Sequence, residues 1–181
     1  LEWARARNAR ATTDEPPGIP IDFATGWVHN APMPTARRKL MDATRPGSYH
    51  LVSRCVRRAF LCGDGLEHRR RWIERDLWSY IASFAIELNG YTVMSNHLHL
   101  VVRNRPDLAG EWAPRTVVER WSALYPKRDE DKQPRDWTDG EITAEMRRPG
   151  RVDELRARLA DPSWLMKILK ERIARRANRE D

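Results

Sequence analysis

The stretch YTVMSNHLHLVV, residues 91–102, decides the fold that we expect for this chain. Its second half alternates, and alternate residues of a β-strand lie on the same face, about 6.6 Å apart along the backbone. His97 and His99 therefore share one face, while Leu98, Leu100 and Val102 share the other. This pattern predicts a strand that packs on a core beneath an exposed polar site, where two imidazoles can converge on one cation.

Composition narrows the class of protein. A chain of 181 residues suits one domain with appendages, and a net charge of +7 with 33% charged residues favours an acidic partner, most commonly nucleic acid. A merely soluble, charged surface is the alternative. Cys55 and Cys62 are the only cysteines, too few for a disulfide framework or a four-cysteine zinc site. No apolar run approaches the roughly 20 residues of a membrane helix, so we predict a cytoplasmic protein without membrane contact.

The chain divides by composition into a leader and a domain. Residues 1–47 are basic and rich in proline, which predicts little stable structure, and Met33 is a candidate for the working start. Residues 48–181 form the predicted domain. Within it, residues 126–150 are dominated by charged residues, proline and glycine, and we expect a flexible insertion there.

Hydrophobic spacing predicts alternating strands and helices, an α+β fold. Strands are expected at residues 49–56, with a short second piece at 59–62, and at residues 85–94, where Asn89-Gly90 marks a turn or bulge. Ser95-Asn96 can make the tight connection to the strand of the histidines. Helices are expected at residues 66–83, 116–124 and 152–159, and a closing helix begins after the possible cap Asp161.

Three motifs in this order resemble one known family. They are YHLVSR at residues 49–54, CVRRAF at 55–60 and, after a helix, GYTVMSNHLH at 90–99. Together they resemble the single-tyrosine HUH transposases, in particular the group related to transposases of repetitive extragenic palindromes, over about residues 33–181. The resemblance implies a ferredoxin-like α+β sandwich, whose antiparallel sheet carries both histidines and packs its helices on the other face.

The resemblance also implies a chemistry. In this family a divalent cation, Mg²⁺ or Mn²⁺, is held by both histidines and a third polar side chain, for which Asn178 is the candidate here. The cation polarises the scissile phosphate of single-stranded or hairpin DNA. A tyrosine then attacks, and the phosphotyrosine link conserves the bond energy for rejoining the strand elsewhere, which is DNA transposition. Relatives act as monomers or as homodimers that share sites between chains.

This sequence departs from the family pattern where the nucleophile is expected. The closing helix of relatives carries a tyrosine a few residues before the asparagine that matches Asn178, but Ile173 and Arg176 stand at the nearest positions here. Of the tyrosines present, Tyr125 is the first to test as nucleophile. Relatives also continue into a basic segment beyond the position of Asp181. We therefore expect either a strand-cleaving enzyme or a truncated, catalytically inactive relative that only binds DNA.

Basic residues near the motifs are the candidates for contacts with DNA phosphates. Such residues are as often solvated or paired with carboxylates as bound to a phosphate, and arginines on a helix usually form its wet face. The helical triplet Arg69 to Arg71 is expected on outer turns. The predicted contacts are His50, Arg54, Arg57 and Arg58 near the first strand and Arg172, Arg175 and Arg176 on the closing helix.

Overall fold

A computed structural model describes residues 41–55, 61–63 and 65–180 of the chain. Nearly all of the predicted leader, with Met33, lies outside these residues, and so do residues 59 and 60 of the strand predicted at 59–62. The secondary structure elements are β1 (Gly47–Arg54), α2 (Glu67–Ile81), β2 (Ile86–Val93), β3 (His97–Asn104), α3 (Pro106–Glu111), α4 (Pro114–Leu124), β4 (Lys127–Arg128), β5 (Pro134–Arg135), α5 (Asp139–Met146), α6 (Arg151–Leu159) and α7 (Pro162–Glu180).

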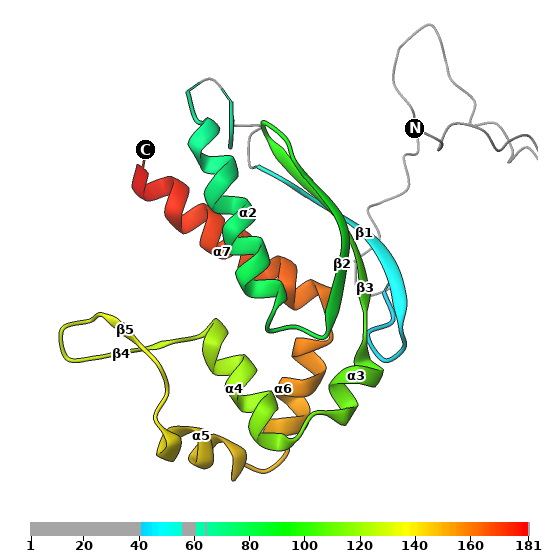
Figure 1. The fold of residues 1–181 in the computed structure, drawn as a ribbon, viewed down its shortest axis with the longest axis vertical. Helices are drawn as coiled ribbons and strands as arrows, with labels where there is room; N and C mark the ends of the chain where they lie inside the picture. The colour runs from blue at the N-terminus through cyan, green and yellow to red at the C-terminus, as the bar shows by residue number, and fades with distance from the viewer. Residues whose placement is uncertain (1–40, 56–60, 64, 181) are drawn as a thin grey trace, which may run out of the picture. The chain divides into compact units, whose positions relative to one another are not determined.

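The main sheet has the order β1-β3-β2, and both outer strands run antiparallel to β3 (Figure 1). The β2-β3 hairpin turns at Ser95-Asn96, where the Met94 amide donates to the carbonyl of His97 at 2.8 Å. The register of β2 shifts between Leu88 and Gly90, which confirms the bulge predicted there. An α+β fold is therefore confirmed, with the histidine strand at the centre of the sheet.

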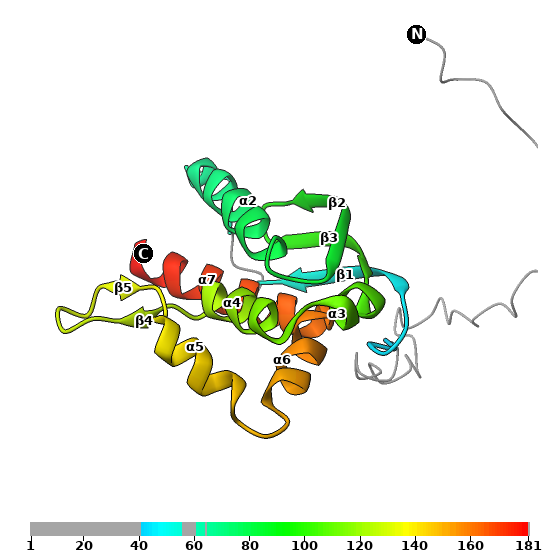
Figure 2. The ribbon, with the colours of Figure 1, turned by 60° about the horizontal axis from the view of Figure 1, so that its bottom comes forward.

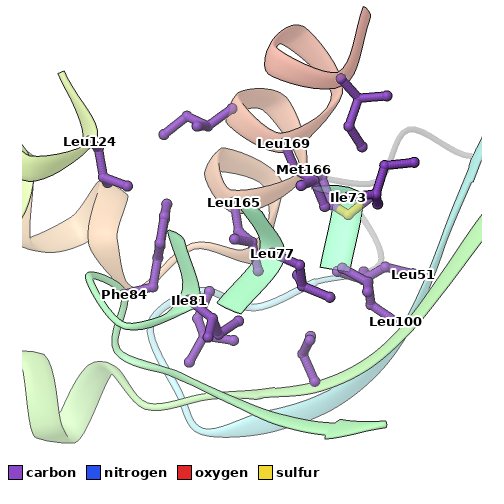
Figure 3. Packing of buried hydrophobic residues seen from close by; sticks show 14 of the residues in the cluster. Leu51, Ile73, Leu77, Ile81, Phe84, Leu100, Leu124, Leu165, Met166 and Leu169 are labelled. Carbon is purple, nitrogen blue, oxygen red and sulfur yellow. The ribbon is translucent and has the colours of Figure 1, made fainter. Parts of the chain in front are cut away.

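Two helices cover one face of this sheet, α2 and α7, which lie on the same side of the strands in Figure 1. Their apolar stripes follow the helical spacing predicted from the sequence. Ile73 and Leu77 of α2 and Leu165 of α7 are fully buried and belong to one cluster with Leu51 and Leu100 of the sheet (Figure 3). Removal of this apolar surface from water is the main force that fixes which face of the sheet is covered.

A second group of helices, α3 to α6, follows the sheet in sequence (Figure 2). Val117 and Trp121 of α4 are buried together with Leu155 and Leu159 of α6. The Ala85 amide, just before β2, donates to the carbonyl of Leu159 at 2.9 Å and joins this group to the sheet. None of the helices in the described ranges is both long and apolar enough to cross a membrane.

The segment 126–150 contains regular structure, which the expectation of a flexible insertion did not include. It forms the β4-β5 hairpin and α5. Thr138 caps α5 in a capping box, in which its hydroxyl accepts from the Glu141 amide and the Glu141 carboxylate accepts from the Thr138 amide. Glu141 also pairs with Arg135 at 2.8 Å and with Lys127 at 2.9 Å. Some of the charged residues that suggested disorder in this segment thus form ion pairs with one another within it.

Candidate functional site on the open face of the sheet

The histidine pair lies on the face of β3 that points away from the helices. His97 and His99 are both half-buried, and their ring centroids are 4.8 Å apart with an interplanar angle of 68°. Leu98 and Leu100 between and beyond them are buried in the core. The alternation predicted from the sequence is confirmed, because it directs the imidazoles outward while the leucines anchor the strand.

A third imidazole joins this pair from β1. The antiparallel register sets His50 opposite Val101 and Val52 opposite His99, so His50 is the diagonal neighbour of His99 on the same face. Nε2 of His50 lies 2.8 Å from Nδ1 of His99, and the two rings stack with centroids 5.0 Å apart. His50 is thus part of the histidine cluster, defined here as His50, His97 and His99.

Asn96 holds the first histidine of the pair. Its Oδ1 lies 2.6 Å from Nδ1 of His97, and it sits in the tight turn that precedes β3. From the sequence Asn96 was expected in the turn and in the motif at residues 90–99, but its contact with His97 was not predicted. The signal that could have identified it is its position directly before the two histidines, because a neighbour in a tight turn can reach the next side chain.

Arg54 brings positive charge to the histidine cluster. It ends β1, its Cα partner is His97, and its side chain is exposed. No carboxylate pairs with it in the part of the chain that the structure describes. Burial lowers the pKa of His99 below its ordinary value, and the neighbouring His97, His50 and Arg54 lower it further because each disfavours a second positive charge.

His97 and His99 are the side chains that could hold a metal ion. Within residues 41–55, 61–63 and 65–180, no group of three or more histidine, cysteine, aspartate or glutamate side chains is arranged for that purpose. The third imidazole does not complete such a group, because one nitrogen of His50 is directed at the ring of His99. Any ion here would take its remaining ligands from outside this set.

Asn178 and Tyr125 are not brought to the histidine cluster. Asn178 is exposed on α7, a helix that packs against α2 on the covered side of the sheet. Tyr125 follows the end of α4, and its ring lies 4.6 Å from that of Trp121. Burial raises the pKa of the Tyr125 phenol, which makes it harder to deprotonate.

The remaining tyrosines also lie elsewhere. Tyr49 alternates with His50 on β1, and its hydroxyl donates to the carbonyl of Asp42 at 3.1 Å. Tyr91 pairs in register with Leu100 and packs edge-on against Trp78 of α2. Tyr80 is part of α2 itself, and burial raises its pKa. None of the chain's 4 tyrosines therefore shares the outer face with the histidines.

The arginines predicted to bind DNA from the closing helix have partners within the protein. Arg172 donates to the carbonyl of Leu124 at 2.9 Å, and Arg175 pairs with Glu171 at 2.5 Å. Arg176 lies over the Trp72 ring at 4.5 Å. Arg57 and Arg58 fall outside the described residues.

Arg69, expected on an outer turn of α2, is buried. It is only 2% exposed, and its Nε donates to the Glu180 carboxylate at 3.1 Å. The expected position was wrong because the ion pair joins α2 to the end of α7, a tertiary contact that helical spacing alone cannot reveal. Arg70 and Arg71 are exposed as expected.

A scan with protein-family models, a search of curated proteins and a search of solved structures each found no match to this chain.

Proposed function

We propose that this protein binds single-stranded or hairpin DNA across the open face of its sheet, with Mg²⁺ or Mn²⁺ held between His97, His99 and a DNA phosphate. The observation that carries the proposal is the gathering of His50, His97, His99 and Arg54 on a face that the described helices leave uncovered. Of the sequence motifs that resemble HUH transposases, the one at residues 49–54 lies on β1, and the one at residues 90–99 runs from β2 through the turn into β3.

The donor set fits a cation that is shared with a nucleic acid. Only neutral imidazole binds a metal, and the lowered pKa of His99 favours its neutral form at neutral pH. Two imidazoles leave most positions of Mg²⁺ or Mn²⁺ open, and these hard ions prefer oxygen ligands there. Phosphate and water oxygens meet that need, and a bound cation would polarise the phosphate.

Positive charge supports the choice of DNA as the partner. The chain carries a net charge of +7, and Arg54 at the edge of the histidine cluster is exposed and available for a phosphate. Arginine can fork onto two phosphate oxygens at once. The arginines of α7 that are held by intramolecular partners contribute less to this surface.

Strand cleavage and transfer is the second candidate function. It is favoured by the histidine pair, which can bring a cation to a scissile phosphate, and it requires a tyrosine that this face lacks. In a homodimer that shares sites between chains, the tyrosine could come from the second copy. Binding without cleavage requires no such arrangement, and we therefore place it first.

The strand order and the free cysteines are compatible with this proposal. The order β1-β3-β2, with α2 connecting the two parallel outer strands, matches part of a ferredoxin-like sheet. Cys55 and Cys62 are both free thiols, and thiols stay reduced in the cytoplasm, where we place the protein.

The proposal is tested by binding to labelled single-stranded and hairpin oligonucleotides with Mn²⁺ or with EDTA. We expect binding that is tighter with Mn²⁺, and a variant with both H97A and H99A that loses this difference. H68A is the matched control, since His68 contacts Glu180 away from the sheet face. A DNA adduct that resists denaturant would establish the second candidate. Failure to bind even at low salt, where basic proteins bind DNA most strongly, would refute both.

A further inference from the structure

We infer that Asn96 and His50 are positioning residues, which hold the Nδ1 protons of His97 and His99 and so leave the Nε2 atoms of both rings free to bind the cation. This inference rests on the proposed function and extends it to a layer of residues behind the two ligands.

The proton position on His97 follows from the chemistry of its partner. The atom 2.6 Å from Nδ1 of His97 is the amide oxygen of Asn96, which can only accept a hydrogen bond. Nδ1 must therefore carry the proton. A neutral imidazole has one proton, so Nε2 of His97 keeps a lone pair, which is the form that a cation requires.

The His50–His99 contact allows two arrangements, and only one of them suits a cation. If His50 donated from Nε2, then His99 would accept at Nδ1, and its own proton would occupy Nε2. If His99 donates from Nδ1 across the 2.8 Å contact, then its Nε2 is free and His50 carries its proton on Nδ1. A cation at Nε2 of His99 selects the second arrangement.

Backbone geometry holds both partners in place. Asn96 directly precedes β3, and the register of β1 with β3 fixes His50 beside His99. A histidine that binds a metal usually donates its other N–H to such a partner, which orients the ring and fixes its tautomer. Here each of the two histidines has its own acceptor.

Variants of His50 show whether this residue accepts a hydrogen bond from His99, binds the cation directly or only packs against the His99 ring. H50L removes the acceptor, H50Q offers an amide oxygen in its place, and H68Q on α2 is the matched control. Mn²⁺ affinity is measured by electron paramagnetic resonance on the full chain without DNA. We expect H50L to bind Mn²⁺ roughly ten- to a hundredfold more weakly, the usual loss for such a partner, and H50Q and H68Q to bind almost as well as the unmodified protein.

The role inferred for Asn96 can be tested without a metal, because it fixes the position of the proton on His97. In ¹⁵N spectra of the metal-free protein at a pH where the imidazoles are neutral, we expect the His97 proton on Nδ1, and a mixture of tautomers in N96L. A proton on Nε2 of His97 in the unmodified protein would overturn the positioning role of Asn96.

The remaining outcomes separate the inference from the proposed function. Equal loss of Mn²⁺ affinity in H50L and H50Q would overturn the positioning role of His50, and so would full affinity in H50L. Absence of Mn²⁺ binding by the unmodified protein without DNA would overturn the His50 assignment, and if Mn²⁺ also failed to tighten DNA binding the cation of the proposed function would fall with it, while the tautomer of His97 would still be read from the ¹⁵N spectra.

Discussion

Truncation of Leu100 to alanine should destabilise the fold strongly, while the same truncation of its neighbour Val101 should not. Leu100 is 0% exposed and lies on the inner face of the central strand, beneath α2 and α7. Replacement of a buried leucine by alanine costs about 2–5 kcal/mol, from lost burial and from the cavity that remains. Since domains of this size have a total stability of about 5–15 kcal/mol, the loss is a large share of it.

The assay is thermal and urea unfolding followed by circular dichroism. At about 2–4 °C per kcal/mol, L100A should lower the melting temperature by roughly 4–20 °C. Val101 is 42% exposed on the opposite face, so V101A should change the stability by no more than about 0.5 kcal/mol. A loss in V101A as large as in L100A would refute the reasoning, because the outer face of the sheet would then be covered rather than open.

The other predictions concern the site. R54A should weaken DNA binding to all sequences alike and reduce the salt slope of the affinity by about 1, whereas R175A, which removes an arginine already paired with Glu171, should leave both unchanged; equal effects in titrations at several salt concentrations would contradict this. Y125F should leave DNA binding, and any denaturant-resistant adduct on a gel, as in the unmodified protein, since Tyr125 lies away from the histidines; loss of an adduct in Y125F would assign it as the nucleophile. Because the pKa of His99 is below its ordinary value of 6.5 in the folded protein, the unfolded chain binds more protons there, and the free energy of unfolding should fall as the pH drops from about 6.5 through the lowered pKa. Urea midpoints measured over that range should show a smaller fall in H99Q, and an identical fall would contradict the assignment to His99.

Most of the fold could be predicted from the sequence because its signals are periodic. A period of two residues identified β3 and its buried face, and helical spacing identified α2, α4, α6 and α7. The signal failed at residues 126–150, where the capping box of Thr138 and Glu141 holds a helix that has few apolar residues. In that segment, polar contacts rather than an apolar stripe specify the structure. A prediction from composition alone therefore favours disorder there.

The site was less predictable than the fold, since it depends on register as well as on period. Alternation alone shows that His97 and His99 share a face. The pairing of His50 with His99 requires the exact alignment of β1 with β3, and a slip of one residue would direct His50 to the opposite face. The partners of Arg69 and Arg176 are likewise set by the packing of α2 against α7, which no local pattern records.

The same alternation that exposes the histidines directs two tyrosines away from them. Tyr49 is adjacent to His50 on β1, and Tyr91 pairs in register with Leu100. Both tyrosines therefore lie on the inner face of the sheet, which the helices cover. A one-residue shift of β1 that exposed Tyr49 would also expose the core residue Leu51, and the same shift of β2 would expose Val93 together with Tyr91. Either shift would lose the free energy that burial of these apolar side chains contributes. In the proposed function this surface binds a phosphate backbone and a cation together, and a tyrosine that attacks there must come from outside the sheet.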